Sequence, residues 1–196
     1  MIAGHFGFAA GVKSVERHVP LWSLMLATVW LDVVFVPLFL AGIETIEKAP
    51  DATGSYGGGI IHANYTHSLV GAVLLSLIFG WVFSWFWGRR TGTILGLVAF
   101  SHWVLDLLVH RADMPLLPGA IGGMPTFGLG LWRYPTIAAL VELALVVAGS
   151  WLYWRAARGA VRASGSTRMG RADLSGGLIL VVGVGALVAD LTGFLG

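Results

Sequence analysis

Charged side chains are scarce in this chain of 196 residues, because only 11% of its residues are Asp, Glu, Lys or Arg. A soluble domain has about 25%. Hydrophobic residues make up 57% of the chain, and the mean hydropathy is +0.82. The core of so small a soluble domain cannot bury that much apolar surface. The composition therefore excludes an ordinary soluble protein and favours one whose helices face lipid.

Cysteine is absent from the chain. Its absence excludes disulfides, thiolate zinc sites and iron–sulfur clusters. Any metal ion must then be held by imidazole nitrogen and carboxylate oxygen atoms. The chemistry of a metal site, if there is one, rests on six histidines and ten acidic residues.

Five apolar stretches have the length of about twenty residues that a helix needs to cross about 30 Å of hydrocarbon. They are residues 21–43, 66–87, 93–110, 134–154 and 176–195. Residues 1–12 are apolar but too short to cross, and their charges follow them, unlike those of a signal peptide. The sequence thus predicts an all-α integral membrane protein, one domain over 1–196, with five transmembrane helices and a short N-terminal re-entrant or half-crossing helix.

Basic residues cluster in the segments that would share one side of the membrane. Nine of the twelve lie before the first span or in the second and fourth connections: Lys13, Arg17, Arg89, Arg90, Arg155, Arg158, Arg162, Arg168 and Arg171. The positive-inside rule places that side in the cytoplasm of a bacterial inner membrane. The stretch 155–171 has no aromatic residue for stacking on bases, so it favours an orientation signal beside anionic lipid and argues against a nucleic-acid partner.

Ionisable residues within spans are costly and therefore candidates for function. They are Asp32, His67, His102, Asp106, His110, Glu142 and Asp190. His102, Asp106 and His110 are spaced i, i+4, i+8, so they share one helix face. At a rise of about 1.5 Å per residue, Asp32, His102, Asp106 and Asp190 lie about 14 to 21 Å from the cytoplasmic end of their spans. His5 reaches a similar level if residues 1–12 form a helix anchored by the charges that follow.

Some of these residues have an ordinary structural explanation. A lone Asp or Glu in a span, such as Asp190 or Glu142, commonly bonds to a neighbouring helix. His18 and His62 lie near span boundaries, where a solvated histidine is common. The group of His5, Asp32, His67, His102 and Asp106 is different, because several carboxylates and imidazoles in an apolar region need a cation to neutralise them. We therefore expect these five to be metal ligands, in the outer half of the bilayer.

Two motifs resemble a known family. At Tyr65-Thr66-His67-Ser68-Leu69 and at Ser101-His102-Trp103-Val104-Leu105-Asp106 the chain resembles the bacterial inner-membrane metal-dependent hydrolases. In that family an early His, an Asp on the next helix, Thr-His-Ser and Ser-His-x-x-x-Asp recur in this order. The resemblance covers about the first 118 residues, and His110-Arg111-Ala112-Asp113-Met114-Pro115-Leu116 resembles a subgroup of bacterial membrane proteins. Where the family has a second Asp after Asp32, this chain has Val34, so the resemblance does not extend to a second metal site.

The leading hypothesis is a membrane-embedded hydrolase that uses a divalent metal, zinc or alternatively Mn or Fe, on a lipid-like or membrane-accessible ester or phosphoester. His110 or Glu142 would be the general base. Contacts to the substrate, a lipid or another small molecule, would come from Arg111, Asp113 and His62. The alternatives are an ion- or proton-coupled transporter that uses the same side chains, and a haem-binding accessory protein with His67, His102 or His110 as axial ligands.

Overall fold

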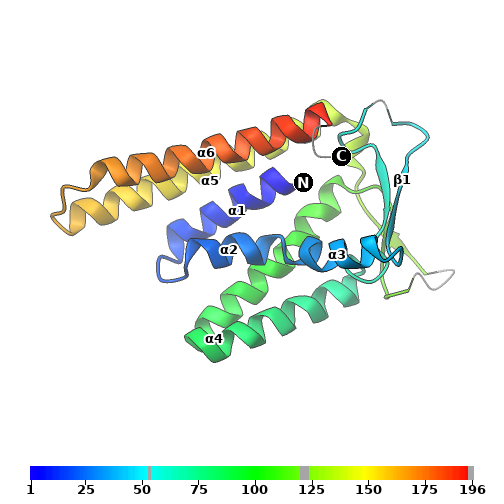
Figure 1. Ribbon diagram of the computed structural model, residues 1–196, viewed down its shortest axis with the longest axis horizontal. Helices are drawn as coiled ribbons and strands as arrows, with labels where there is room; N and C mark the ends of the chain where they lie inside the picture. The colour runs from blue at the N-terminus through cyan, green and yellow to red at the C-terminus, as the bar shows by residue number, and fades with distance from the viewer. Residues whose placement is uncertain (53, 120–123, 194–196) are drawn as a thin grey trace.

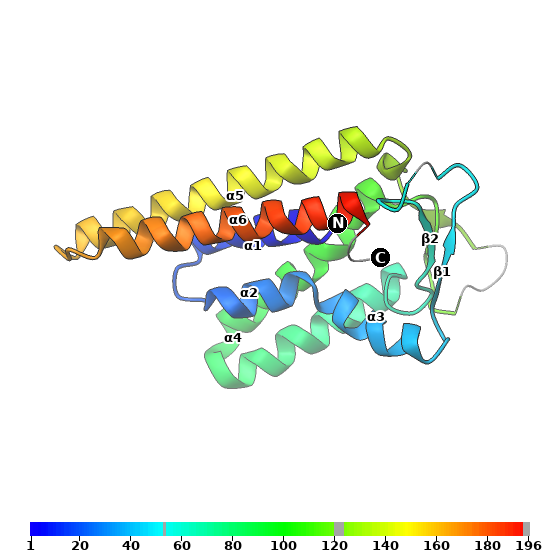
Figure 2. The same cartoon turned by 45° about the horizontal axis from the view of Figure 1, so that its top comes forward.

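The computed structural model describes residues 1–52, 54–119 and 124–193, and most of them are helical (Figure 1). Within these ranges the chain forms six α-helices. They are α1 (Ile2–Val15), α2 (Leu21–Thr28), α3 (Trp30–Leu40), α4 (Leu69–Val109), α5 (Pro135–Ala163) and α6 (Met169–Thr192). A short 3₁₀ turn, η1 (Leu131–Arg133), precedes α5. In Figure 2 α5, α6 and α1 form one layer, and α2, α3 and α4 lie below it.

The helices have the length and surface of membrane spans. α4, α5 and α6 are each long and apolar enough to cross a bilayer, and α2 with α3 forms a bent pair that passes the same test. Only 17–28% of the residues in their most apolar windows are buried inside the molecule. Large apolar side chains such as Leu77, Ile78 and Val181 are exposed, which a water-soluble surface would not tolerate. The length and apolar surface of these helices indicate a multi-pass membrane protein.

Helix α4 is a hairpin, because Gly88 at its middle has a φ of 81° and breaks the helical conformation. Its two arms, residues 69–87 and 89–109, correspond to the predicted spans 66–87 and 93–110. They approach closely, since a Cβ on Gly80 would lie 2.7 Å from the carbonyl oxygen of Gly92. Glycine at both positions lets the arms pack backbone to backbone.

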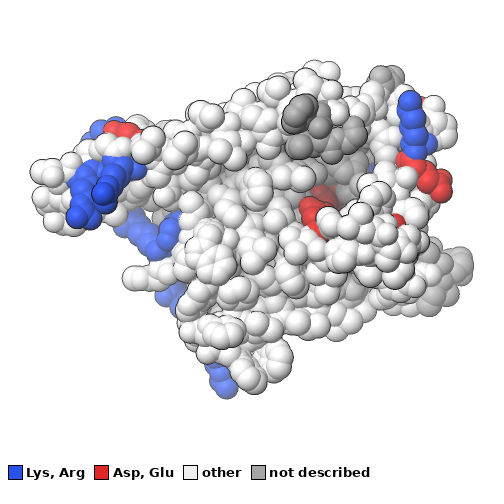
Figure 3. Space-filling view, in the orientation of Figure 1, with Lys and Arg blue, Asp and Glu red and all other residues white. Residues whose placement is uncertain are grey.

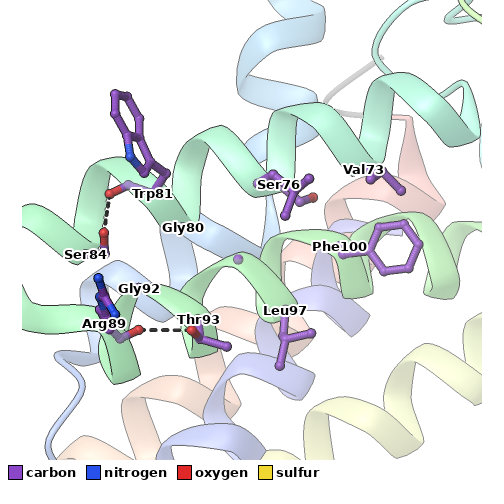
Figure 4. A pocket seen from close by; sticks show the side chains of 12 residues that line it. Val73, Ser76, Gly80, Trp81, Ser84, Arg89, Gly92, Thr93, Leu97 and Phe100 are labelled. Atoms are coloured by element: carbon purple, nitrogen blue, oxygen red, sulfur yellow. Dashed lines mark hydrogen bonds between the residues drawn. The ribbon is translucent and has the colours of Figure 1, made fainter.

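A groove of about 510 Å³ lies along the two arms, between Arg89 at the turn and Phe100 (Figure 4). Its walls are mostly apolar. His102, which is two residues beyond Phe100, projects about 200° around the helix from it. The groove therefore faces away from the histidines of this arm.

The predicted span 21–43 is divided at Val29, where α2 and α3 meet at an angle of 50°. Thr28 makes bonds to other helices at this break. Its hydroxyl donates to the carbonyl oxygen of His5 at 3.2 Å, and its own carbonyl oxygen lies 2.8 Å from His102 Nδ1. These tertiary bonds stabilise a bend that the apolar sequence does not indicate.

The other helix ends also differ from the predicted spans. α5 continues to Ala163, beyond the predicted end at residue 154, and α6 begins at Met169 rather than residue 176. Alanine and arginine favour a helix in water as well as in lipid, so apolarity marks the span and not the whole helix. The last predicted residues of this span, 194 and 195, lie outside the described residues.

Helix α1 covers only part of the molecule and packs against α5 (Figure 1). The two backbones touch at glycines. A Cβ on Gly7 would lie 2.5 Å from the carbonyl group of Leu145, and a Cβ on Gly149 would overlap the carbonyl oxygen of Gly7. This contact positions His5 inside the helix bundle.

The expectation of an all-α chain is wrong in the loops at one end of the molecule, where two small antiparallel sheets form. β1 (Thr45–Lys48) pairs with β2 (Gly59–His62), and β3 (Met114–Pro115) pairs with β4 (Thr126–Phe127). Their backbone groups need partners where the helices end, and strand pairing supplies them. These loops lie opposite the α5–α6 connection (Figures 1 and 2).

Basic side chains gather at the end of the molecule that carries the α5–α6 connection, at the left in Figure 3. The C-terminal end of α1 and the turn of α4 lie toward the same end (Figure 1). Arg90 Nη2 at the α4 turn is 3.1 Å from Glu16 Oε2, just after α1. The three basic regions of the sequence therefore meet at one end, as the predicted topology requires.

Candidate metal centre

Five side chains from four segments meet between the helices. His5 comes from α1, Asp32 from α3, His67 from the turn before α4, and His102 and Asp106 from the second arm of α4. Two triads have ligand atoms within 4.8 Å of one another: His5 with His102 and Asp106, and Asp32 with His67 and His102. All but Asp32 are buried.

The atoms at the centre of the cluster have the spacing of metal ligands. His102 Nε2 lies 3.0 Å from Asp106 Oδ2, 3.2 Å from His67 Nε2 and 3.5 Å from Asp32 Oδ1. His67 Nε2 is 3.5 Å from Asp32 Oδ1 and 3.6 Å from Asp106 Oδ2. Four ligands about 2.0–2.1 Å from a tetrahedral ion lie roughly 3.4 Å apart. The atoms of either triad can therefore surround a single ion.

A backbone contact determines that Nδ1 of the His102 ring carries a hydrogen. Its Nδ1 is 2.8 Å from the carbonyl oxygen of Thr28, which can only accept, so Nδ1 carries the hydrogen. In the neutral ring Nε2 then has a lone pair, and it faces the carboxylates of Asp32 and Asp106. Lone pairs repel one another unless a cation lies between them.

The ring of His67 also carries a hydrogen on Nδ1, and two side chains, Thr66 and Glu44, determine this. The hydroxyl of Thr66 donates to Glu44 Oε2 at 2.9 Å, and its oxygen is 2.9 Å from His67 Nδ1. Since the only hydroxyl hydrogen goes to Glu44, Thr66 accepts from Nδ1, and the lone pair of His67 is on Nε2. Metal-bound histidines in proteins are usually held by this kind of hydrogen bond from the other ring nitrogen.

His110 lies next to the cluster with its Nε2 3.6 Å from Asp106 Oδ2. Its Nδ1 donates to Asp113 Oδ1 at 3.0 Å, and Asp113 Oδ2 accepts from the backbone N–H of Ile61 at 2.9 Å. In its neutral form His110 therefore has its lone pair on Nε2, which faces Asp106. Its ring packs against Trp132, with 4.5 Å between ring centroids.

His5 approaches the other oxygen of Asp106. Its Nε2 is 3.1 Å from Asp106 Oδ1, and its ring stacks on that of His102 with 4.0 Å between centroids. His5 Nδ1 is buried without a hydrogen-bond partner. His5 thus fixes the orientation of Asp106, so that Oδ2 faces the other histidines.

The net charge of the cluster favours a divalent ion. Asp32 and Asp106 contribute two negative charges, and imidazoles in their neutral form do not offset these charges. Two uncompensated charges in an apolar interior are very costly, and one divalent cation balances them. The Asp32 side chain is 36% exposed, so it forms the open side of the site. Figure 3 shows acidic side chains within a hollow midway along the molecule.

Glu142 is buried on α5, and both of its carboxylate oxygens are engaged. Oε2 accepts from the backbone N–H of Gly4 at 3.1 Å, and Oε1 accepts from the hydroxyl of Tyr56 at 2.6 Å. Burial raises the pKa of Tyr56 far above its ordinary value, and the hydrogen bond to Glu142 raises it further. These bonds tie α5 to the start of α1 and to the loop after β1.

The residues expected to contact substrate are each paired with another side chain of the protein. Arg111 Nη1 donates to both oxygens of Asp51, at 2.6 and 2.8 Å. That hydrogen bond lowers the pKa of Asp51. His62 is on β2, partly exposed and 3.6 Å from Glu47 Oε2. Asp113 holds His110.

Sequence reasoning missed three contributors to the site: Glu44, Tyr56 and the carbonyl oxygen of Thr28. Glu44 is fully buried and also accepts from the N–H groups of Tyr65 and Thr66. Its one signal is its place directly after the apolar run 21–43. The carbonyl oxygen of Thr28 has no signal in the sequence, because every residue has one.

Comparison with protein families, with characterised proteins and with solved structures gave no match. The fold and the buried His/Asp cluster define the class as a helical multi-pass membrane protein with a candidate metal site.

Proposed function

We propose that the protein is a membrane-embedded metal-dependent hydrolase, related to the bacterial inner-membrane family that its motifs resemble. Five transmembrane helices and the half-crossing α1 would surround the site, with the basic end in the cytoplasm and the cluster in the outer half of the bilayer. The substrate would be a lipid-like or membrane-accessible ester or phosphoester. The observation that carries the proposal is the convergence of the Nε2 atoms of His67 and His102 on two carboxylates.

Asp32, His67, His102 and Asp106 would hold the ion, with His5 orienting Asp106. Zinc suits a set of imidazole and carboxylate ligands in tetrahedral spacing, and Mn or Fe are the alternatives. A bound divalent ion would supply Lewis acidity and lower the pKa of water at the site. The ligand set is thus typical of metal-assisted hydrolysis.

Of the two candidate bases, the contacts favour His110 over Glu142. In its neutral form His110 has its lone pair on Nε2 beside the cluster, whereas both oxygens of Glu142 already accept hydrogen bonds. His110 would accept a proton from water as the water oxygen bonds to the carbonyl carbon or phosphorus. The bond from that atom to the alcohol oxygen breaks, and the proton passes to the leaving alcohol. Asp113 keeps the ring in the required tautomer.

The test is hydrolysis by detergent-purified protein that is stripped with a chelator and reloaded with Zn, Mn or Fe. Substrates are p-nitrophenyl butyrate, bis-p-nitrophenyl phosphate and a dihexanoyl lipid. We expect turnover that requires metal, disappears in Asp106→Asn and persists in His18→Ala, a matched change at an exposed histidine. No turnover with any metal would contradict the proposal. Proton flux in proteoliposomes that is lost in Asp106→Asn would favour the transporter, and a Soret band would favour haem.

A further inference from the structure

A second cavity, of about 360 Å³, lies at the loop end of the molecule beside the candidate metal centre. Its lining includes Arg111, Asp113 and Arg133, together with Asp51 on the loop after β1. Asp113 is shared between the two sites, because it also bonds to His110 Nδ1. The cavity is therefore separated from the metal cluster by one pair of side chains.

Arg111 is a buried cation with unused hydrogen-bonding capacity. Only 7% of the residue is exposed. Both hydrogen bonds to Asp51 come from Nη1 of Arg111, while its Nε is buried without a partner. A guanidinium group normally binds a carboxylate or phosphate with two of its nitrogens, so the contact with Asp51 leaves the usual forked arrangement unfilled.

Asp51 is the movable half of this ion pair. Its side chain is 56% exposed and belongs to a loop, whereas Arg111 is fixed at the end of α4. Arg133 on η1 adds a second positive charge that acts on Asp51. Asp113 keeps its own negative charge beside the cavity, but its oxygens are already engaged with His110 Nδ1 and the N–H of Ile61. When Asp51 moves away, two arginines face the cavity.

We propose that this cavity binds a phosphate group of the substrate, and that Asp51 occupies Arg111 until that phosphate replaces it. A phosphate monoester carries about two negative charges, which match the two arginines. Because His110 and Asp113 lie between the cavity and the cluster, the bound phosphate anchors the substrate and is not the reacting group. The inference rests on the proposed function, because the bound molecule is a substrate only if the protein is a hydrolase. It narrows the substrate class to esters that carry a phosphate group.

The test measures binding to detergent-purified protein by calorimetry, with glycerol 3-phosphate and dihexanoyl phosphatidate as probes. Asp51→Asn removes the competing carboxylate from an exposed loop, so we expect affinity to rise about threefold. Arg111→Met should weaken binding more than about tenfold, and Arg111→Lys should restore it only in part. Arg162→Met, at the far end of α5, should bind as wild type does.

The two probes separate the sources of phosphate. Binding of both supports a site for any phosphate monoester, and binding of phosphatidate alone supports a lipid headgroup. Unchanged or weaker binding in Asp51→Asn would overturn the inference, as would wild-type affinity in Arg111→Met. The gain in Asp51→Asn keeps the test decisive even if Arg111→Met does not fold.

Hydrolysis data distinguish failure of this inference from failure of the proposed function. If dihexanoylglycerol, which lacks phosphate, is hydrolysed as fast as dihexanoyl phosphatidate and Arg111→Met changes neither rate, the hydrolase proposal stands and the phosphate site is refuted. If phosphate binds through Arg111 but no ester is hydrolysed with any metal, the phosphate site stands and the hydrolase proposal is refuted.

Discussion

Thr66 orients the ring of His67 although it does not itself face the centre of the cluster. Its oxygen accepts the Nδ1 hydrogen of His67, and its hydroxyl donates to Glu44. Thr66→Val keeps the shape but removes both bonds, so His67 Nε2 is no longer held toward the ion. We predict a loss of metal affinity of about 10- to 100-fold, measured by competition with a chromophoric chelator. Thr93→Val, at an exposed hydroxyl, is the control and should bind metal normally.

Glu142 has the contacts of a structural residue. Glu142→Gln would present an amide N–H to one of two donors, Gly4 N–H or Tyr56 OH. We predict that it lowers stability by about 1–3 kcal/mol and leaves metal content unchanged, as judged by thermal melting and elemental analysis. A variant that melts normally but no longer hydrolyses ester would instead make Glu142 the base.

Tyr56 should make stability depend on alkaline pH. Its pKa is raised in the folded protein above the ordinary value of 10.0, so its contribution is complete below that pH and is lost as pH rises above it. We predict that the melting temperature of wild type falls more steeply between pH 9 and 11 than that of Tyr56→Phe. Parallel curves for the two proteins would refute this.

At the scale of elements, the position of His5 depends on how closely α1 meets α5. Gly7→Ala would put a Cβ 2.5 Å from the Leu145 carbonyl group, whereas a Cβ on Gly11 has its nearest neighbour at 3.9 Å. We predict that Gly7→Ala destabilises by about 1–3 kcal/mol and weakens metal binding. Gly11→Ala should be neutral or stabilising by up to about 1 kcal/mol. Equal melting temperatures would show that the helices do not cross here.

Elements also show what could be predicted from the sequence. The apolar runs located the arms of α4, together with α5 and α6. The bend at Val29, the extra turns of α5 and the paired strands were not predicted, because tertiary hydrogen bonds and solvated helix ends leave no apolar pattern.

For the site, motif spacing found His5, Asp32, His67, His102 and Asp106. Glu44 and the Thr28 carbonyl oxygen could not be found, because only the fold brings them to the histidines.

At the scale of the whole molecule, the two ends should lie on opposite sides of the membrane. The chain has no cysteine, so single cysteines report position without background. We predict that Ser55→Cys, in the loop after β1, reacts with an impermeant maleimide in intact spheroplasts. Ser164→Cys, after α5, should react only once the membrane is permeabilised. Labelling of both from the same side would refute the topology.

We propose above all that the buried cluster binds one divalent metal ion. Elemental analysis of detergent-purified protein tests this binding most directly. We predict about one zinc, manganese or iron ion per chain. The metal should be lost from a variant with both His102→Ala and Asp106→Ala and retained in His18→Ala. A folded wild-type protein that contains no stoichiometric metal after purification and reloading would contradict it, as would metal content that the paired substitution leaves unchanged.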